Sequence, residues 1–304
     1  MKPRRSILSV PGHVEKMHEK ARTGAADVVM LDLEDSVPVD DKVTARTRIV
    51  QSLLHLDWGD KILTFRINGL DTSFGYRDLM EVGEAAGHRI DAVVIPKVNG
   101  PADVHFADRM LRGIEMNRGG NWRVGIEASI ETARGLERVG EIARASDRLV
   151  SLIFGVADYS ASVGAKLVSL SGHGEGETEI YPGHRWHFPL SRMVMAAKSN
   201  GLLAIDAPFG NFRDPDGLEK AAAAACAIGC DGKWAIHPSQ IDPINRVFSP
   251  SREDVDRAMR ILEASEGGRS MGRGAVNVDG RMVDGATVRL ARQLVAQARR
   301  LNLA

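Results

Sequence analysis

Short apolar runs alternate with longer amphipathic stretches over most of the chain. The apolar runs are rich in Val, Ile and Leu, as in strands that a parallel sheet buries on both faces. They predict strands at 7–10, 28–33, 62–67, 92–95, 123–126, 149–154, 202–205 and 233–236. The amphipathic stretches predict helices near 14–24, 40–54, 75–87, 101–117, 132–145, 189–200, 215–228 and 251–265.

Strands that are each followed by a helix, eight times within residues 1–265, predict an α/β fold of the (β/α)₈ TIM-barrel type. A doubly wound open sheet is the alternative architecture. That fold favours a glycine-rich GxGxxG turn after its first strand, and the chain has SVPGHVEK there instead. The barrel is therefore the better prediction, with residues 1–265 as the catalytic domain.

Two segments interrupt this alternation. Residues 164–187 form a long Gly-rich insertion after the sixth predicted strand, on the side of the barrel where active sites form. Residues 266–280 predict a Gly-rich linker, and 284–302 then predict an amphipathic helix beyond the barrel. We expect residues 266–304 to form a helical arm that buries its apolar stripe against a neighbouring subunit.

Composition excludes several classes of partner. The 40 acidic and 40 basic residues cancel, so there is no global positive field to hold a nucleic acid or an anionic membrane. The two cysteines are too few for a disulfide framework. The apolar runs fall short of the ~20 residues of a membrane span, and the N-terminal run is too short for a signal peptide. We therefore expect a soluble, cytoplasmic protein.

Charged residues gather directly after the predicted strands, where the catalytic groups of TIM barrels lie. Chains emerge into water at strand ends, which explains one such residue but not a charge at nearly every strand. The residues concerned are Asp32, Glu34, Asp35, Arg66, Lys97, Glu127, Glu131, Asp158, Asp206 and His237.

Glu131 and Asp158 follow neighbouring strands and are the candidate metal ligands. Mg²⁺ takes one or two protein carboxylates and completes its octahedron with water and substrate oxygens. The spacing fits equally well an alternative in which Glu131 caps the next helix and Asp158 bonds backbone in a turn.

Arg66 ends the third predicted strand, where its guanidinium can bind a carboxylate or stabilise an enolate oxygen. A purely structural arginine is the alternative. His237 can act as a general acid or base, but a histidine bonded to nearby backbone is the simpler interpretation of its position before Pro238.

The motifs at these positions resemble the citrate lyase β-subunit-like, or HpcH/HpaI, aldolase group, and within it the bacterial L-malyl-CoA/β-methylmalyl-CoA lyases. The similarity extends in order over nearly the whole chain. It is carried by VPGH (10–13), ADVVMLDLEDSVPVDDK (26–42), RINGLDT (66–72), VVIPKV (93–98), IETARGL (130–136), FGVADYSASVG (154–164), AIDAPFGNFRD (204–214), GKWAIHPSQI (232–241) and GRMVD (280–284).

This resemblance implies a Mg²⁺-dependent lyase, with Mn²⁺ as an alternative metal, built as a trimer-based homohexamer. Its reaction would be the reversible cleavage of L-malyl-CoA or β-methylmalyl-CoA to glyoxylate and acetyl-CoA or propionyl-CoA. The alternatives are a citramalyl-CoA lyase that releases pyruvate, a malyl-CoA thioesterase, and a non-catalytic subunit of a larger acyl-carrier lyase complex.

The resemblance also implies individual roles. Glu131 and Asp158 match magnesium ligands, and Arg66 matches the arginine that stabilises the enolate. Asp284 matches an acid/base carboxylate that is supplied to a neighbouring subunit. The matches to further substrate or coenzyme A contacts are Lys20, Ala157, Ile236 and His237.

The chain departs from the family pattern directly after Gly12. The family commonly has Ser-Arg-Pro or Ser-Lys-Pro there, and this chain has His13, Val14 and Glu15. The usual phosphate-binding arginine is therefore missing at Val14. Lys16 and Arg5 are the expected substitutes.

Overall fold

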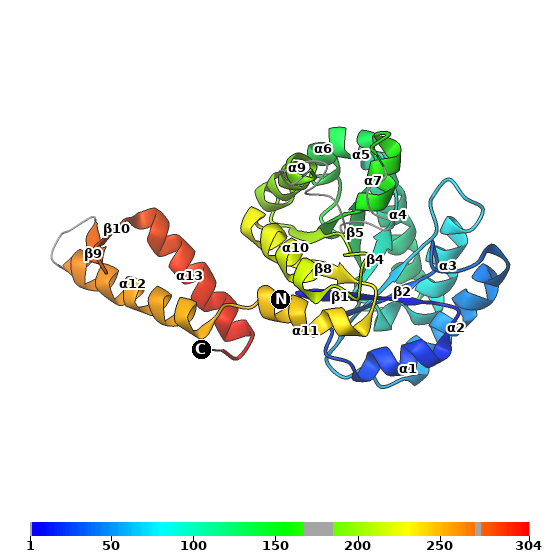
Figure 1. Ribbon diagram of the computed structural model, residues 1–304. Coiled ribbons are helices and arrows are strands. Elements are labelled where there is room, and N and C mark those ends of the chain that lie inside the picture. The colour runs from blue at the N-terminus through cyan, green and yellow to red at the C-terminus, as the bar shows by residue number, and fades with distance from the viewer. Residues whose placement is uncertain (1, 167–184, 271–274, 304) are drawn as a thin grey trace. The chain divides into compact units, whose positions relative to one another are not determined.

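The computed structural model describes residues 2–166, 185–270 and 275–303 (Figure 1). The chain divides into two compact units, one formed by Arg4–Asn245 and one by Met1–Pro3 with Arg246–Ala304. Most of the predicted insertion, at 167–184, lies outside the described residues. The described part of the chain contains no helix that is long and apolar enough to cross a membrane.

The first unit is a closed parallel barrel, which confirms the predicted fold class. Each strand pairs with the next in chain order, and β8 returns to pair with β1. The strands are β1 (Ser6–Pro11), β2 (Val28–Asp32), β3 (Ile62–Arg66), β4 (Ala92–Ile95), β5 (Gly125–Ile130), β6 (Leu149–Phe154), β7 (Leu203–Asp206) and β8 (Gly232–Ala235).

Helices surround the strands of this unit (Figure 1). Among the described residues, the α-helices are α1 (Glu15–Thr23), α2 (Lys42–His55), α3 (Gly75–Ala86), α4 (Pro101–Asn117), α5 (Ala133–Glu137), α6 (Val139–Ile142), α7 (Val156–Ser162), α9 (His187–Ser199), α10 (Pro215–Ile228) and α11 (Ile241–Val247). Short 3₁₀ turns are η1 (Val39–Asp41), η2 (Gly87–Arg89) and η3 (Pro238–Gln240).

An apolar cluster fills much of the barrel interior. A single cluster joins side chains from seven of the eight strands, and β-branched residues dominate it, as expected for side chains that stack in layers inside a TIM barrel. Its buried members are Ile7, Val28, Met30, Ile62, Val94, Ile153, Ile205 and Trp234. Because this core fixes the strands rigidly, the side chains at their carboxyl ends are held in defined positions.

β5 differs from its prediction. The apolar run predicted a strand at 123–126, whereas the strand begins at Gly125 and continues to Ile130. Glu127 interrupts the apolar pattern, but inside the fold it is buried and ion-paired with Arg4. The partner lies far away in the sequence, so the local pattern ended the predicted strand too early.

The helix predicted at 132–145 is broken into α5 and α6. Thr132 begins α5 because its side chain accepts a hydrogen bond from the N–H of Gly135. A Cβ at Gly135 would overlap the carbonyl oxygen of Val98. The helix therefore packs directly against the loop after β4, and this contact fixes where the β5 loop ends.

The second unit contains α12 (Arg252–Ser270), the antiparallel strands β9 (Val276–Val278) and β10 (Arg281–Val283), and α13 (Gly285–Arg300). The two helices pack through Ala258, Ala291 and Val295. The amphipathic C-terminal helix is thus confirmed. The segment expected as a linker at 266–280 instead continues α12 to Ser270 and enters a β-hairpin at Val276, and the unit begins at Arg246.

A buried ion pair between the last residue of β7 and a residue of β8 generates the first prediction. Nζ of Lys233 donates to Asp206 at 2.5 Å and to the carbonyl of Ala207 at 2.7 Å. Lys233→Met should lower the free energy of unfolding by about 3–5 kcal/mol, because it leaves the Asp206 carboxylate buried without its cation. Urea unfolding measures this. Lys198→Met, which removes a surface pair with Asp231, should cost less than about 1 kcal/mol; equal losses would contradict the argument.

Candidate active site

The carboxyl ends of β2 to β6 bring five charged side chains to one rim of the barrel. Asp32 and Arg66 are the last residues of β2 and β3 and are register partners. Lys97 follows β4, Glu131 follows β5, and Asp158 lies in the first turn of α7 after β6. Active sites of TIM barrels form at this end of the strands, so the rim is the candidate site.

Arg66 is held from two sides. Its Nε and Nη2 donate to the two carboxylate oxygens of Asp32, both at 2.7 Å, and its Nη1 lies 2.8 Å from Oε2 of Glu34. Its guanidinium also lies 5.4 Å from the ring centroid of Trp234 on β8. Burial acts to raise the pKa of Asp32, but the charge and hydrogen bonds of Arg66 outweigh it and lower that pKa to about 2. The guanidinium is thereby fixed in orientation.

Glu131 is only 3% exposed. Its Oε1 accepts a hydrogen bond from the backbone N–H of Lys97 at 2.6 Å, and a Cβ on Gly155 would overlap its other oxygen. Burial, together with the negative charges of Glu34 and Asp158, raises the pKa of Glu131 to about 7, although Arg66 opposes the shift. A carboxylate in this setting gains strongly from a nearby cation.

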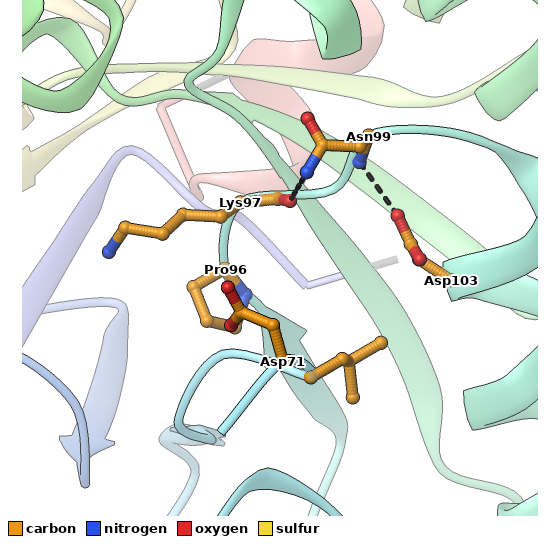
Figure 2. Close-up of a pocket in the computed structure, with 6 residues that line it drawn as sticks. Asp71, Pro96, Lys97, Asn99 and Asp103 are labelled. Carbon is orange, nitrogen blue, oxygen red and sulfur yellow. Dashed lines mark hydrogen bonds between the residues drawn. The ribbon is translucent and has the colours of Figure 1, made fainter. Parts of the chain in front are cut away.

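Lys97 lies between Glu34, which follows β2, and Asp158, which follows β6. Its Nζ donates to Oε1 of Glu34 at 2.5 Å and lies 3.7 Å from a carboxylate oxygen of Asp158. Figure 2 shows its side chain running away from Asn99 and Asp103, which line the same small polar pocket. At about 90 Å³ this pocket is too small for a whole coenzyme A thioester.

The charges of these residues suit a divalent metal ion. Asp32 is matched by Arg66, and Glu34 by Lys97. Lys97 also lies 3.7 Å from Asp158 and from the exposed Asp35, and Glu131 and Asp158 together have a formal charge of −2 when both are ionised. Among the described residues, no group of three or more His, Cys, Asp or Glu side chains converges as a metal site. Two carboxylates are what Mg²⁺ commonly takes from a protein when water and substrate supply its other ligands, so the donor set fits.

The HpcH/HpaI aldolase/citrate lyase family model matches residues 5–238. The chain belongs to this family. It is 42% identical to an L-malyl-CoA/β-methylmalyl-CoA lyase of Cereibacter sphaeroides, over 99% of this chain and 96% of the relative. It is 36% identical to a malyl-CoA/β-methylmalyl-CoA/citramalyl-CoA lyase of Chloroflexus aurantiacus, over 98% and 89% of the two chains.

A solved family structure is also similar. The protein CitE from Mycobacterium tuberculosis, in complex with magnesium, acetoacetate and coenzyme A, has a TM-score of 0.76 and 30% sequence identity. The similarity covers 97% of this chain and 98% of that one. The resemblance drawn from the motifs is therefore confirmed.

The structure brings Arg66, Glu131 and Asp158 to the same rim, as the family motifs predict. The alternative that Glu131 caps a helix is wrong, because Thr132 caps α5. His237 follows β8, and its Nδ1 accepts a hydrogen bond from the N–H of Ser239. The backbone-bonded interpretation of this histidine is thus confirmed, while a role in binding substrate stays a prediction.

The other expected site residues occupy varied positions. Ala157 is exposed beside Asp158, and Ile236 is exposed after β8. Lys20 is exposed in the last turn of α1. Asp284 belongs to the second unit, where it is the N-cap of α13 and accepts from the N–H groups of Ala286 and Thr287. Those hydrogen bonds lower its pKa.

Arg5 is not a suitable substitute for the arginine missing at Val14. It precedes β1, at the amino end of the strand, where its guanidinium binds both carboxylate oxygens of Asp27 at 2.9 and 2.7 Å. Arg48 of α2, which no motif singled out, lies closer to the β1 loop and donates to the carbonyl of His13 at 2.5 Å. Lys16 is exposed in α1.

Sequence reasoning placed Asp32, Glu34 and Lys97 at the rim but gave them no role. Their importance comes from contacts with Arg66 and Glu131, which are more than 30 residues away in the chain. The Pro-Lys pair directly after β4 was the available signal for Lys97, since a lysine at that point of a barrel strand faces the rim.

The raised pKa of Glu131 predicts a pH dependence of stability in chelator-treated protein. The unfolded chain releases this proton near pH 4.5 and the folded protein near 7. The contribution of this group to the free energy of unfolding is therefore fully present below pH 4.5 and is lost as pH rises to about 7. Glu131→Gln should remove this decline and gain up to about 3 kcal/mol over wild type at pH 8.

Urea unfolding at pH 4.5 and pH 8 in EDTA measures the effect. Glu84→Gln on α3 controls for the loss of one exposed carboxylate. A difference between E131Q and wild type that stays constant with pH would contradict the assignment.

Proposed function

We propose that this protein is a Mg²⁺-dependent carbon–carbon lyase that reversibly cleaves L-malyl-CoA or β-methylmalyl-CoA. The products are glyoxylate and acetyl-CoA or propionyl-CoA. The observation that carries the proposal is the rim itself, where a rigidly held Arg66 lies beside a buried Glu131 and a half-exposed Asp158. The two relatives named for this reaction, which match nearly the whole chain, support it.

Glu131 and Asp158 would hold the metal ion, with Mn²⁺ as an alternative to Mg²⁺. When bound, the ion supplies Lewis-acid stabilisation of negative charge on the oxygens of the oxo-acid half of the substrate. The complex of CitE with magnesium supports this choice. The N–H of Lys97 positions Glu131 by holding one of its carboxylate oxygens at 2.6 Å.

Arg66 stabilises the enolate. Cleavage of the carbon–carbon bond transfers its electron pair to the acyl-CoA fragment, where negative charge develops on the thioester oxygen. A guanidinium already fixed by Asp32 and Glu34 meets that charge without reorganising, which is the main advantage of a preorganised site. Protonation of the enolate carbon, by the proton that Asp284 has taken from the substrate hydroxyl, then gives the acyl-CoA product.

Asp284 accepts the proton of the substrate hydroxyl as the bond breaks. Its hydrogen bonds to the first N–H groups of α13 favour the ionised form, so it enters the reaction as a base. We propose that it serves a neighbouring subunit of a homo-oligomer, a trimer-based hexamer. Lys20, Ala157, Ile236 and His237 contact the coenzyme A thioester.

The proposal is tested with malyl-CoA, β-methylmalyl-CoA and citramalyl-CoA, each with and without EDTA. Release of glyoxylate with a free acyl-CoA is expected, and EDTA should abolish it. If only citramalyl-CoA is cleaved, with release of pyruvate, the protein is a citramalyl-CoA lyase. Free malate and coenzyme A would assign a thioesterase. Cleavage of all three thioesters that persists in EDTA would contradict the requirement for a metal ion.

Removing either carboxylate should abolish cleavage and leave the fold intact. Glu131→Ala and Asp158→Ala each take away one of two protein ligands, so kcat should fall by at least about 10³-fold, several kcal/mol of barrier. Glyoxylate release measures the rate, and circular dichroism and light scattering check fold and oligomer. Glu84→Ala on α3 is the control for the loss of an exposed acidic side chain. Near-normal turnover of either rim variant would show that the metal assignment is wrong.

Subunit complementation tests the shared site. Asp284→Ala and Arg66→Ala should each be nearly inactive alone, because each lacks one group that the reaction needs. After partial dissociation, mixing and reassembly in equal amounts, roughly a quarter of the sites regain both groups, a level far above the residual rates. Subunit exchange is verified separately with two differently tagged chains. Verified exchange with no regained activity, or a fully active monomer, would contradict a base supplied from another subunit.

A further inference from the structure

Lys97 makes more contacts with the rim than its sequence position suggests. It is one of three non-glycine residues with a positive φ, 51°, in the described part of the chain. L-residues rarely adopt this conformation, and it persists where surrounding contacts hold it. The conformation lets one residue reach both halves of the site, with its N–H bonded to Glu131 and its ammonium group bonded to Glu34.

The loop around Lys97 is anchored on its other side. The carbonyl of Lys97 accepts from Nδ2 of Asn99 at 3.0 Å (Figure 2), and Oδ1 of Asn99 accepts from the hydroxyl of Thr132 at 2.6 Å. Thr132 is the residue that caps α5, directly after Glu131. The backbone of Lys97 is therefore fixed, while its side chain is 33% exposed.

The ammonium group lies in a field of negative charge. Its Nζ is 2.5 Å from Glu34, 3.7 Å from Asp35 and 3.7 Å from Asp158. Asp158 is one of the two carboxylates proposed to hold the divalent cation, and Glu131 is bonded to the backbone of the same lysine. A unit positive charge at this place partly neutralises the cluster that a divalent cation would otherwise neutralise.

We propose that Lys97 is the internal counter-ion of this carboxylate cluster and that it weakens and thereby sets the affinity for the divalent cation. The ammonium group neutralises Asp158 and Glu34 in the metal-free protein and withdraws from Asp158 when the cation binds. This inference rests on the proposed metal site. It adds that the protein carries its own competitor for that site.

A simple structural role predicts the opposite result. If Lys97 only oriented the carboxylates, its neutral replacement would loosen them and weaken metal binding. If it is the counter-ion, the neutral replacement removes a repulsion between like charges and strengthens binding. The backbone N–H that holds Glu131 remains in every variant, so the comparison isolates the charge of the side chain.

The test is calorimetric titration of chelator-stripped protein with Mn²⁺ and with Mg²⁺, together with thermal unfolding before and after metal addition. Lys97→Met should lower Kd on the order of tenfold, as expected for one unit charge removed near a divalent ion in a solvent-like dielectric. Its metal-free Tm should fall and its metal-induced rise in Tm should exceed that of wild type. Lys97→Arg keeps the charge and should stay within about threefold of wild type.

Lys61→Met is the matched control. Lys61 is a lysine next to the start of β3 whose Nζ donates to the carbonyls of Gly24 and Ala26, at 2.5 and 3.0 Å, so its loss should leave Kd unchanged. If Lys97→Met does not fold, Lys97→Gln carries the same expectation, because its amide lacks the charge and still donates to Glu34.

The outcomes separate the two proposals. A wild type that binds Mn²⁺ at the rim, with neutral variants that bind equally or more weakly, would overturn the role of Lys97 and leave the metal site standing. A wild type that binds neither ion, checked with Glu131→Ala as the blank, would overturn the metal site and the counter-ion with it.

Discussion

The ion pair between Arg66 and Asp32 is the constraint around which the rim is built. Both residues end neighbouring strands, and Asp32 is fully buried. Taking a carboxylate and a guanidinium out of water is costly, and only close two-point geometry offsets that cost. The barrel supplies such geometry because the strand register places the two side chains side by side. The guanidinium of Arg66 is therefore fixed in position. Around it lie Glu34, Lys97 and Glu131.

Negative charge exceeds positive charge at this rim. Arg66 and Lys97 face Asp32, Glu34, Asp35, Glu131 and Asp158. This excess of negative charge, together with burial, raises the pKa of Glu131 to about 7. Such a site is unfavourable when empty and favourable when a cation is bound, so stability has been given up locally for binding. The apolar cluster inside the barrel and the buried pair of Lys233 and Asp206 support the strands against that local cost.

The two units divide the proposed chemistry. The barrel holds the groups proposed to bind the metal ion and stabilise the enolate, and the unit with α12 and α13 holds Asp284. The N-cap position of Asp284 suits both folding and the proposed function, since the same helix N–H groups that need an acceptor also favour the ionised carboxylate. In the proposed mechanism the base Asp284 is carried on a separate unit, whereas the charge stabilisation by Arg66 belongs to the barrel.

The sequence by itself determined the architecture and the candidate residues of the site. Strand periodicity is local, so seven of the eight strands were found to within a residue or two, and the motifs named Arg66, Glu131 and Asp158. Only the tertiary structure decided which charges pair. Glu127 is tolerated inside β5 because of Arg4, 123 positions away, and Lys97 joins Glu34 to Glu131 across 63 and 34 positions. Apolar burial is read from neighbours along the chain, but a buried charge is stabilised by a partner that only folding brings near, so its role cannot be assigned before the fold is known.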